Sequence, residues 1–311
     1  MIEFDGVSKF FQGQPAVEGL SFTCREGALT VLVGTSGSGK STTLKMINRL
    51  IEADRGEIRV AGRPVREHDP LDLRRQMGYV IQSVGLFPHW TVARNIATVP
   101  QLLRWPAAKT DARVDTLLTL LGLAPEIYRQ RYPHQLSGGQ QQRVGVARAL
   151  AADPRVLLMD EPFGALDPVT RRALQQEVRR IQQQTRCTLV MVTHDVDEAL
   201  SLADHLVLMD RGRIVQQGTP EALLTRPVSE FVHTFFAASD YGIRLMGLRR
   251  VADYVRPGQW CAGEPLTGEL TLRQALSCFM AARVLRLPVV DSAGQPLGVL
   301  HLEDAVTGAE S

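Results

Sequence analysis

The stretch Gly34-Thr35-Ser36-Gly37-Ser38-Gly39-Lys40-Ser41 decides the fold of this chain. It follows an apolar, strand-like run at 29–33 and leads into a helix-like segment at 42–50. Strand, glycine-rich loop and helix in this order are the context of a P-loop, G-x-x-x-x-G-K-[ST]. Its glycines let several N–H groups turn towards one anion, and the helix start adds partial positive charge. The stretch therefore predicts a nucleoside triphosphate site, in which Lys40 reaches the β- and γ-phosphates and Ser41 ligates Mg²⁺.

The composition is that of an ordinary globular protein. The 311 residues, 44% hydrophobic and 22% charged, suffice for one large domain and a smaller one. A formal net charge of +2 gives no sign of nucleic-acid binding. The four cysteines are widely spaced, so we expect free thiols in a reducing compartment. We find no signal peptide and no apolar run of about 18 residues, so we expect any membrane crossing to belong to another chain.

Apolar strands that alternate with helices predict an α/β fold with a mostly parallel sheet. Fully apolar runs stand at 156–159, 189–192 and 206–209, and a long helix is expected at 168–184. Strands of this kind are buried on both faces, as in sheets covered by helices. Two short strands flanking a turn are predicted at 2–11 and 16–22, and a turn at 210–212 predicts an antiparallel edge.

Two acidic residues, Asp160 and Glu161, directly follow the first of these apolar strands. This position is the carboxyl edge of the expected sheet, where such sheets bind ligands. Beside a P-loop, Asp160 is expected to hold the Mg²⁺ that bridges the phosphates, and Glu161 to polarise the attacking water as a general base. Standing alone, the pair would indicate no more than an acidic helix start before Pro162.

A third motif, Leu136-Ser137-Gly138-Gly139-Gln140, combines a hydroxyl, two glycines and the start of a predicted helix. It is an anion site of the same physical kind as the P-loop. A Ser-Gly-Gly turn by itself usually only begins a helix, so the motif gains its meaning from the others.

In this order, the three motifs resemble the ATP-binding subunit of an ABC transporter over residues 1 to about 236. The resemblance implies a P-loop NTPase fold with an antiparallel β subdomain, a helical subdomain at about 85–150, ATP and Mg²⁺ as ligands, and ATP hydrolysis. Asp160 then matches the Walker B aspartate and Glu161 the catalytic glutamate. The implied ATP-binding residues, mostly of the Walker A motif, are Phe11, Gly34, Thr35, Ser36, Gly37, Ser38, Gly39, Lys40, Ser41 and Thr42. The implied signature motif is Leu136, Ser137, Gly138, Gly139 and Gln140.

Other residues take their roles from the resemblance alone. Gln82 matches the Q-loop glutamine, a Mg²⁺ ligand with Ser41 and Asp160 and a sensor of the permease. Asp167 matches the D-loop, and His194 the switch histidine at the γ-phosphate. The implied catalytic set is Glu161, His194, Gln82 and Lys40. Phe11 stands where the family places an aromatic side chain on adenine, although either Phe11 or its neighbour Phe10 could simply be core.

In that family two copies pack head to tail around two ATP molecules, so the signature motif of one copy completes the P-loop site of the other. The implied partners are a second copy of the chain, transmembrane permease subunits and, indirectly, a periplasmic or lipid-anchored solute-binding protein. No nucleic acid is expected. The implied location is the cytoplasmic face of the inner membrane, where the permease holds the chain peripherally.

The stretches at 45–50 and 77–89 narrow the resemblance to ATPases that import glycine betaine, choline and related osmoprotectants. No residue of such a subunit touches the solute, so this interpretation rests on the resemblance alone. The alternatives are an import ATPase for a different small solute, a soluble ABC ATPase outside transport, and a regulatory module that hydrolyses ATP poorly. The presence of Glu161 argues against the last.

After a predicted linker at 237–247, residues 248–311 carry a second pattern. Apolar strands at 287–290 and 296–300 flank a glycine turn, and an acidic helix start follows at 303–304. This α+β region resembles one cystathionine-β-synthase (CBS) motif, of which osmoprotectant ATPases usually carry two. A complete module would need the copy from a second protomer. A packing or dimerisation role and a sensor of nucleotide or ionic strength are both open.

Overall fold

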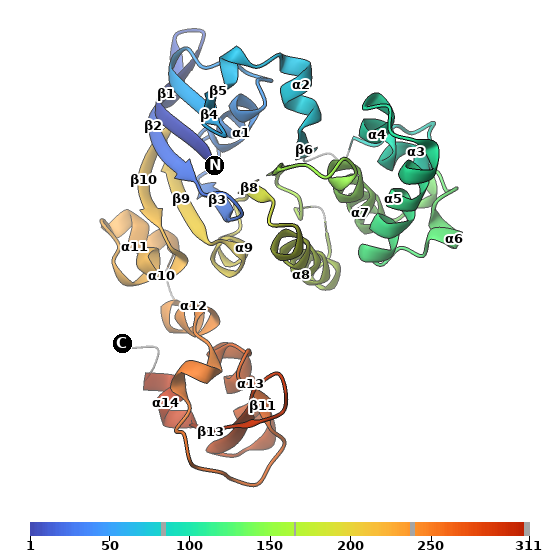
Figure 1. Ribbon diagram of the computed structural model, residues 1–311. Coiled ribbons are helices and arrows are strands. Elements are labelled where there is room, and N and C mark those ends of the chain that lie inside the picture. The colour runs from blue at the N-terminus through green and yellow to red at the C-terminus, as the bar shows by residue number, and fades with distance from the viewer. Residues whose placement is uncertain (82–84, 165, 237–239, 308–311) are drawn as a thin grey trace. The chain divides into compact units, whose positions relative to one another are not determined.

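The computed structural model describes residues 1–81, 85–164, 166–236 and 240–307 (Figure 1). The chain divides into two compact units, Met1–Asp195 with Leu202–Gln217, and Val196–Ser201 with Gly218–Ser311. The larger unit contains two sheets and a group of helices, and the smaller contains a third sheet. The predicted fold class, a P-loop α/β domain with antiparallel, helical and C-terminal α+β parts, is confirmed.

A six-stranded sheet forms the centre of the larger unit. Its order is β10 (Arg213–Gly218), β9 (His205–Asp210), β3 (Leu29–Gly34), β8 (Thr188–Val192), β7 (Val156–Asp160) and β6 (Met77–Val80). The pairs from β9 to β6 are parallel, and every residue of β3, β7 and β8 is buried. The connection of β9 to β10 has two residues, Arg211 and Gly212, both with positive φ, as in a type I′ hairpin. The three apolar runs are thus the buried strands expected.

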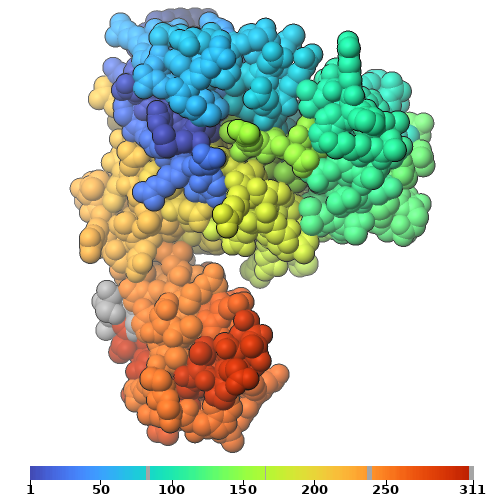
Figure 2. Space-filling view, in the orientation of Figure 1, coloured from blue at the N-terminus to red at the C-terminus, as the bar shows by residue number. Residues whose placement is uncertain are grey.

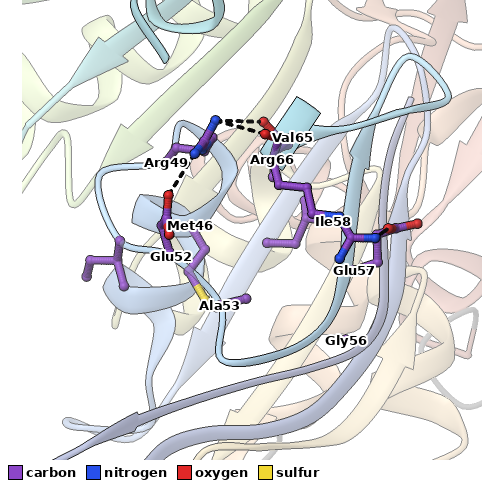
Figure 3. A pocket seen from close by; sticks show the side chains of 10 residues that line it. Met46, Arg49, Glu52, Ala53, Gly56, Glu57, Ile58, Val65 and Arg66 are labelled. Carbon is purple, nitrogen blue, oxygen red and sulfur yellow. Dashed lines mark hydrogen bonds and ion pairs between the residues drawn. The ribbon is translucent and has the colours of Figure 1, made fainter. Parts of the chain in front are cut away.

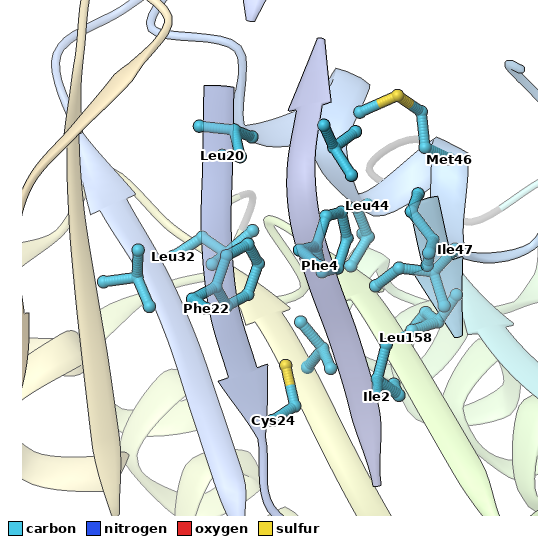
Figure 4. Close-up of a cluster of buried hydrophobic side chains, with 14 of the residues drawn as sticks. Ile2, Phe4, Leu20, Phe22, Cys24, Leu32, Leu44, Met46, Ile47 and Leu158 are labelled. Carbon is cyan, nitrogen blue, oxygen red and sulfur yellow. The ribbon is translucent and has the colours of Figure 1, made fainter. Parts of the chain in front are cut away.

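The second sheet has the order β2 (Gln14–Cys24), β1 (Ile2–Phe11), β4 (Arg55–Val60) and β5 (Arg63–Pro64). Strand β1 is antiparallel to both β2 and β4. Helix α1 (Lys40–Ile47) contributes Leu44, Met46 and Ile47 to a core that also contains side chains from both sheets (Figure 4). Within this core the rings of Phe4 and Phe22 stack with centroids 4.3 Å apart. The helix that follows the P-loop is therefore fixed by packing on two sheets.

Arg49 follows the C-terminal end of α1 and lines a small pocket of about 160 Å³ (Figure 3). Arg49 donates hydrogen bonds to the backbone oxygens of Val65 and Arg66, at 3.4 and 3.2 Å, and pairs with Glu52 at 2.7 Å. Val65 and Arg66 belong to the short 3-10 helix η1 (Val65–Glu67). These bonds tie the antiparallel β region to the P-loop helix.

Helices α3 to α7 form the green lobe in Figures 1 and 2, whereas α2 lies near the sheets and α8 beside β8. In chain order, the further helices of the larger unit are α2 (Pro70–Arg75), α3 (Val92–Ile96), α4 (Thr98–Leu102), α5 (Ala107–Leu120), α6 (Pro125–Tyr128), η2 (Pro133–Gln135), α7 (Gly138–Leu150) and α8 (Pro168–Thr185). Helices α3 to α7 constitute the helical subdomain.

The smaller unit has its own core. Its elements are α9 (Val196–Leu202, except its last residue), α10 (Pro220–Thr225), α11 (Glu230–Phe236), α12 (Tyr241–Leu248), η3 (Val251–Tyr254), β11 (Leu266–Thr267), α13 (Leu272–Ala282), β12 (Arg286–Val290), β13 (Pro296–His301) and α14 (Leu302–Thr307). Strand β12 pairs parallel with β11 and antiparallel with β13. Helix α12 occupies much of the segment that the sequence predicted as a linker. Leu245 and Met246 give this helix a buried apolar face, although the residues around them are typical of turns.

Candidate nucleotide-binding site

Two glycines of the P-loop lie where no side chain fits. A Cβ atom on Gly34, whose φ is 151°, would lie 1.9 Å from the backbone oxygen of Met209 in β9. One on Gly39, whose φ is 92°, would lie 2.3 Å from the Cγ1 atom of Val17 in β2. Gly37 also has positive φ, at 76°, but its Cβ would meet open space. Strands β9 and β2 therefore pack closely against the two ends of the P-loop, at Gly34 and Gly39. The space beside Gly37, in the middle of the loop, is open.

Lys40 lies inside this loop, with only 6% of its surface exposed. Its Nζ donates to the backbone oxygens of Gly34 and Thr35, at 3.0 and 2.7 Å, and to the Ser38 hydroxyl at 3.3 Å. Burial lowers the pKa of Lys40, while the nearby charges of Glu161 and Asp160 act to raise it. A buried ammonium group in a ring of weak neutral acceptors is well suited to bind the stronger charged acceptors of a phosphate group.

The next residue, Ser41, contacts the end of β7. Its hydroxyl donates to Oδ1 of Asp160 at 2.8 Å, and Asp160 is buried. A hydroxyl and a carboxylate side by side, next to a phosphate-binding loop, are the oxygen ligands that Mg²⁺ takes together with substrate phosphates. These two residues thus fit the predicted metal, whereas the third predicted ligand, Gln82, lies outside the described residues.

Glu161 and His194 lie together at the carboxyl edge of the same sheet. The Nδ1 atom of His194 is 3.2 Å from Oε1 of Glu161, and the His194 side chain is 64% exposed. Glu161 has a φ of 46°, and its N–H donates to the backbone oxygen of Val192 in β8 at 3.0 Å. A left-handed backbone is costly for a glutamate and is kept only where the surroundings enforce it, often at functional sites. The strand order thus brings two predicted catalytic residues into contact.

Phe11 ends strand β1 and is 47% exposed, whereas Phe10 beside it is partly buried. The Nζ atom of Lys9 lies 5.5 Å from the centroid of the Phe11 ring. Phe11 is therefore not a core residue, and an exposed aromatic face is what stacking on a base requires. Its contact with adenine stays a prediction.

The signature residues make their contacts in a different part of the larger unit. Ser137 caps helix α7 in a capping box, in which its hydroxyl accepts from the Gln140 N–H at 3.3 Å and the Gln140 side chain accepts from the Ser137 N–H at 3.0 Å. The Gln140 amide donates to the Tyr128 hydroxyl at 3.1 Å. A Cβ on Gly139 would lie 2.8 Å from Cγ2 of Thr170 at the start of α8. The start of α7 therefore packs on α8.

Asp167, the predicted D-loop residue, caps α8. Its Oδ1 accepts hydrogen bonds from the N–H groups of Val169 and Thr170, both at 3.1 Å. The hydrogen bonds from Thr170 hold the pKa of Asp167 below its usual range. Asp167 therefore stays ionised at neutral pH, next to the start of the signature helix.

Two residues of this site went unpredicted. Oδ1 of Asp210, at the end of β9, accepts from the Thr35 hydroxyl at 2.7 Å and so anchors the P-loop. The sequence signal was available, because Asp210 follows an apolar run as Asp160 does. Tyr79 is the second. Burial and the charge of Asp160 raise its pKa to about 12, and its hydroxyl finds no partner among the described residues.

Comparison with known proteins agrees with this geometry. The ABC transporter family matches residues 17–164, and the CBS domain family matches residues 265–309. The glycine betaine uptake system ATP-binding protein of Escherichia coli K12 is 63% identical over 99% of this chain and 100% of its own length. The glycine betaine/carnitine/choline transport ATP-binding protein of Bacillus subtilis 168 is 46% identical over 97% of this chain and 79% of its own length.

Solved structures show the same fold. A dimeric ATP-binding cassette in a post-hydrolysis state, bound to ADP and phosphate, aligns with a TM-score of 0.64 at 28% identity. It covers 71% of this chain and 99% of its own length. Across the described ranges, no helix combines the length and apolar character needed to span a membrane. On these grounds the chain belongs to the ABC transporter family, as an ATP-binding subunit with a C-terminal CBS domain.

Proposed function

We propose that this chain hydrolyses ATP with Mg²⁺ and that the hydrolysis drives import of a solute through a separate permease. The observation that carries the catalytic part is the cluster of Lys40, Ser41, Asp160, Glu161 and His194 at one edge of the central sheet. Lys40 and the N–H groups of the P-loop would bind the phosphates. Ser41 and Asp160 would hold Mg²⁺, which when bound neutralises charge on the β- and γ-phosphates.

The chemical step is assigned to Glu161 and His194. The Glu161 carboxylate would take the proton of the attacking water, as a general base must lie within hydrogen-bond reach of that proton. His194, whose Nδ1 is 3.2 Å from the same carboxylate, would hold it in place and present its other ring nitrogen to the γ-phosphate. The exposure of His194 leaves that face of the imidazole accessible to a bound nucleotide.

We infer that the complete site needs a second copy of the chain. Ser137 and Gly138 are exposed and Gly139 is partly buried, so this end of α7 is accessible to a nucleotide on a partner. The solved cassette of similar fold is a dimer with ADP and phosphate bound. Binding of ATP would then close the dimer, and hydrolysis would reopen it.

The variant Glu161→Gln tests this assignment. It keeps the size of the side chain and the phosphate cradle but removes the base, so we expect ATP binding to persist while turnover falls by about 100-fold or more. Size-exclusion chromatography should show an ATP-dependent dimer that persists in the variant and dissociates in the wild type. Steady-state hydrolysis at the wild-type rate would remove Glu161 from the role of base.

We propose a quaternary ammonium osmoprotectant of the glycine betaine type as the solute. The support is the 63% and 46% identity to two ATP-binding proteins whose names specify glycine betaine, or glycine betaine, carnitine and choline. The permease would hold the chain at the cytoplasmic face of the inner membrane, and a separate binding protein would select the solute.

Uptake by cells tests the solute. Cells lacking this chain should lose uptake of radiolabelled glycine betaine at high osmolarity and regain it with the wild-type chain, but not with Glu161→Gln. If uptake of glycine betaine, choline and carnitine is unchanged while hydrolysis by the purified chain is normal, the ATPase stands and the solute is a different one.

For the domain organisation we propose an ATPase domain at 1–236, a connection at 237–247 and one CBS motif at 248–311. The match of residues 265–309 to the CBS family supports the last of these. Whether this motif completes a module with the copy of a second protomer is tested by crosslinking of the C-terminal regions in the ATP-bound dimer.

A further inference from the structure

The connection between α4 and α5 exposes an unusual group of side chains. We call residues 101–109, Gln101-Leu102-Leu103-Arg104-Trp105-Pro106-Ala107-Ala108-Lys109, the α4–α5 tip. Leu102 is 57% exposed and Leu103 39% exposed, next to Arg104 and Lys109, which are also exposed. In Figure 1, α4 lies in the upper part of the helical subdomain. Two adjacent leucines are exposed to water next to cationic side chains, so burying this surface against a partner would be energetically favourable.

A backbone hydrogen bond closes the turn of the tip. Arg104, two residues after the last residue of α4, has a φ of 56°, and the Trp105 N–H donates to the backbone oxygen of Pro100 at 3.0 Å. The Nζ atom of Lys109 lies 3.8 Å from the centroid of the Trp105 ring. Trp105 is partly buried, and it lies on the same turn as the exposed side chains of Leu102, Leu103 and Lys109.

The charge around the tip has one sign over a long stretch. Residues 73–110 contain five basic residues and no aspartate or glutamate. The next acidic residues along the chain, Asp111 and Asp115, pair with Arg129 at 2.8 and 3.0 Å. Among the described residues no carboxylate pairs with Arg104 or Lys109, whose positive charges face solvent. The tip therefore complements a negatively charged surface with an apolar interior.

We propose that the α4–α5 tip inserts into the headgroup region of an anionic lipid bilayer. Tryptophan and leucine with flanking lysine and arginine are the composition of interfacial membrane contacts. A protein interface would instead bury its apolar centre with few lysines. Each basic residue near an anionic leaflet strengthens binding about fivefold, so the tip alone binds weakly and would add to attachment through a permease. The proposal goes beyond the proposed function and does not depend on it.

Flotation with vesicles tests the proposal on the purified full chain. With vesicles of equal parts phosphatidylglycerol and phosphatidylcholine, we expect the wild type to float, and to float less with phosphatidylcholine alone or at high salt. Leu102→Ser with Leu103→Ser should reduce the partition about tenfold or more. Arg104→Gln with Lys109→Gln should reduce it about 25-fold, and only with anionic vesicles.

Leu71 provides the matched control. It is 58% exposed in α2, as Leu102 is in α4, but it lies between Asp69 and Asp72. Leu71→Ser should therefore leave flotation unchanged. Lipids brominated near the headgroup should quench tryptophan fluorescence in the wild type and much less in Trp105→Phe, which keeps Trp90 and Trp260.

A wild type that does not float, or tip variants that float as it does, would overturn the proposal. So would Leu71→Ser reducing flotation as strongly as the tip variants do. If instead Trp105 is protected from aqueous quenchers only in the complex with a permease, the tip docks on protein and the lipid assignment is wrong. The hydrolysis rate without lipid is measured in parallel, so a failure of this proposal is distinguishable from a failure of the proposed ATPase.

Discussion

Gly34 and Gly37 belong to the same loop for different physical reasons. Both have positive φ, but a side chain at Gly34 would collide with the backbone of β9, while one at Gly37 would face open space. A rigid backbone atom cannot move aside as a flexible side chain can. Gly34 is thus required by the packing of the sheet, and Gly37 by backbone conformation and, in our proposal, by the nucleotide.

The pair of variants Gly34→Ala and Gly37→Ala separates these reasons. We expect Gly37→Ala to lower the free energy of unfolding by about 1–2 kcal/mol, the cost of a left-handed alanine. Gly34→Ala should lower it by more than that, because the backbones of β3 and β9 must separate. Denaturant unfolding without nucleotide measures both. Equal losses of stability would contradict the packing argument for Gly34.

At the scale of the element, helix α7 begins with a residue that has two tasks. The Ser137 hydroxyl caps the helix inside its own chain. In the proposed dimer it also faces the nucleotide of the partner. An alanine variant of Ser137 cannot separate the two roles. It removes the hydroxyl that would face the nucleotide, and it also removes the cap, which by itself lowers the stability of the helix by about 1 kcal/mol.

Ser137→Asp keeps the cap and changes the charge. Aspartate is as good an N-cap as serine, so we expect the thermal stability of the monomer to stay close to that of the wild type. Its carboxylate would repel the γ-phosphate, so ATP-dependent dimerisation and hydrolysis should be lost. Thr271→Asp, in the corresponding capping box of α13, is the matched control and should leave both unchanged. Normal dimerisation of Ser137→Asp would contradict the in-trans site.

At the scale of the whole molecule, the smaller unit is held together by its own core and by several arginine side chains, of which Arg256 binds two carboxylates. Residues such as Leu272, Phe279 and Val289 form a buried cluster of this unit. Arg256 donates to both carboxylate oxygens of Asp304, at 2.7 and 2.8 Å, and to Glu303. These hydrogen bonds from Arg256 hold the pKa of Asp304 below its ordinary value.

This ion pair predicts how the unit responds to pH. The pKa of Asp304 is lower in the folded state than its value of about 3.9 in the unfolded state. The stability that the ion pair contributes is therefore complete above about pH 3.9, and it is lost as the pH falls through the pKa of the folded state. We expect the hydrogen-exchange protection factors of the α13 and α14 amides, which compare each rate with that of an unfolded chain at the same pH, to fall below about pH 4 in the wild type. In Arg256→Gln these protection factors should be smaller at neutral pH and depend less on pH. Because both side chains are partly exposed, the effect should shrink at high salt.

Arg250→Gln is the control for this measurement. The guanidinium of Arg250 donates to the backbone oxygen of Glu269, which does not titrate. This variant should lose some stability at every pH and keep the pH dependence of the wild type. A wild-type pH dependence in Arg256→Gln would mean that Asp304 owes its lowered pKa to another group.

The sequence by itself determined the P-loop, the buried strands and the acidic pair after β7. These features depend on local signals, since glycine spacing and continuous apolar runs restrict what a few neighbouring residues can do. The sequence predicted a linker at 237–247, whereas the structure has helix α12 over much of it, with residues such as Met246 packed in the core of the smaller unit. The anchoring role of Asp210 also escaped prediction, although its position after an apolar strand was a usable signal.

Only the tertiary structure decided which of these pieces meet. The order β9-β3-β8-β7 places the ends of four strands from distant parts of the chain side by side, and so joins Thr35 to Asp210, Ser41 to Asp160 and Glu161 to His194. The solvent exposure of a side chain is likewise a property of the folded chain. It distinguishes the exposed Phe11 from the partly buried Phe10, and it identifies the leucines of the α4–α5 tip as surface residues. Local sequence fixes the chemistry that a residue carries, whereas long-range packing fixes its neighbours, because strand pairing and burial depend on every other segment at once.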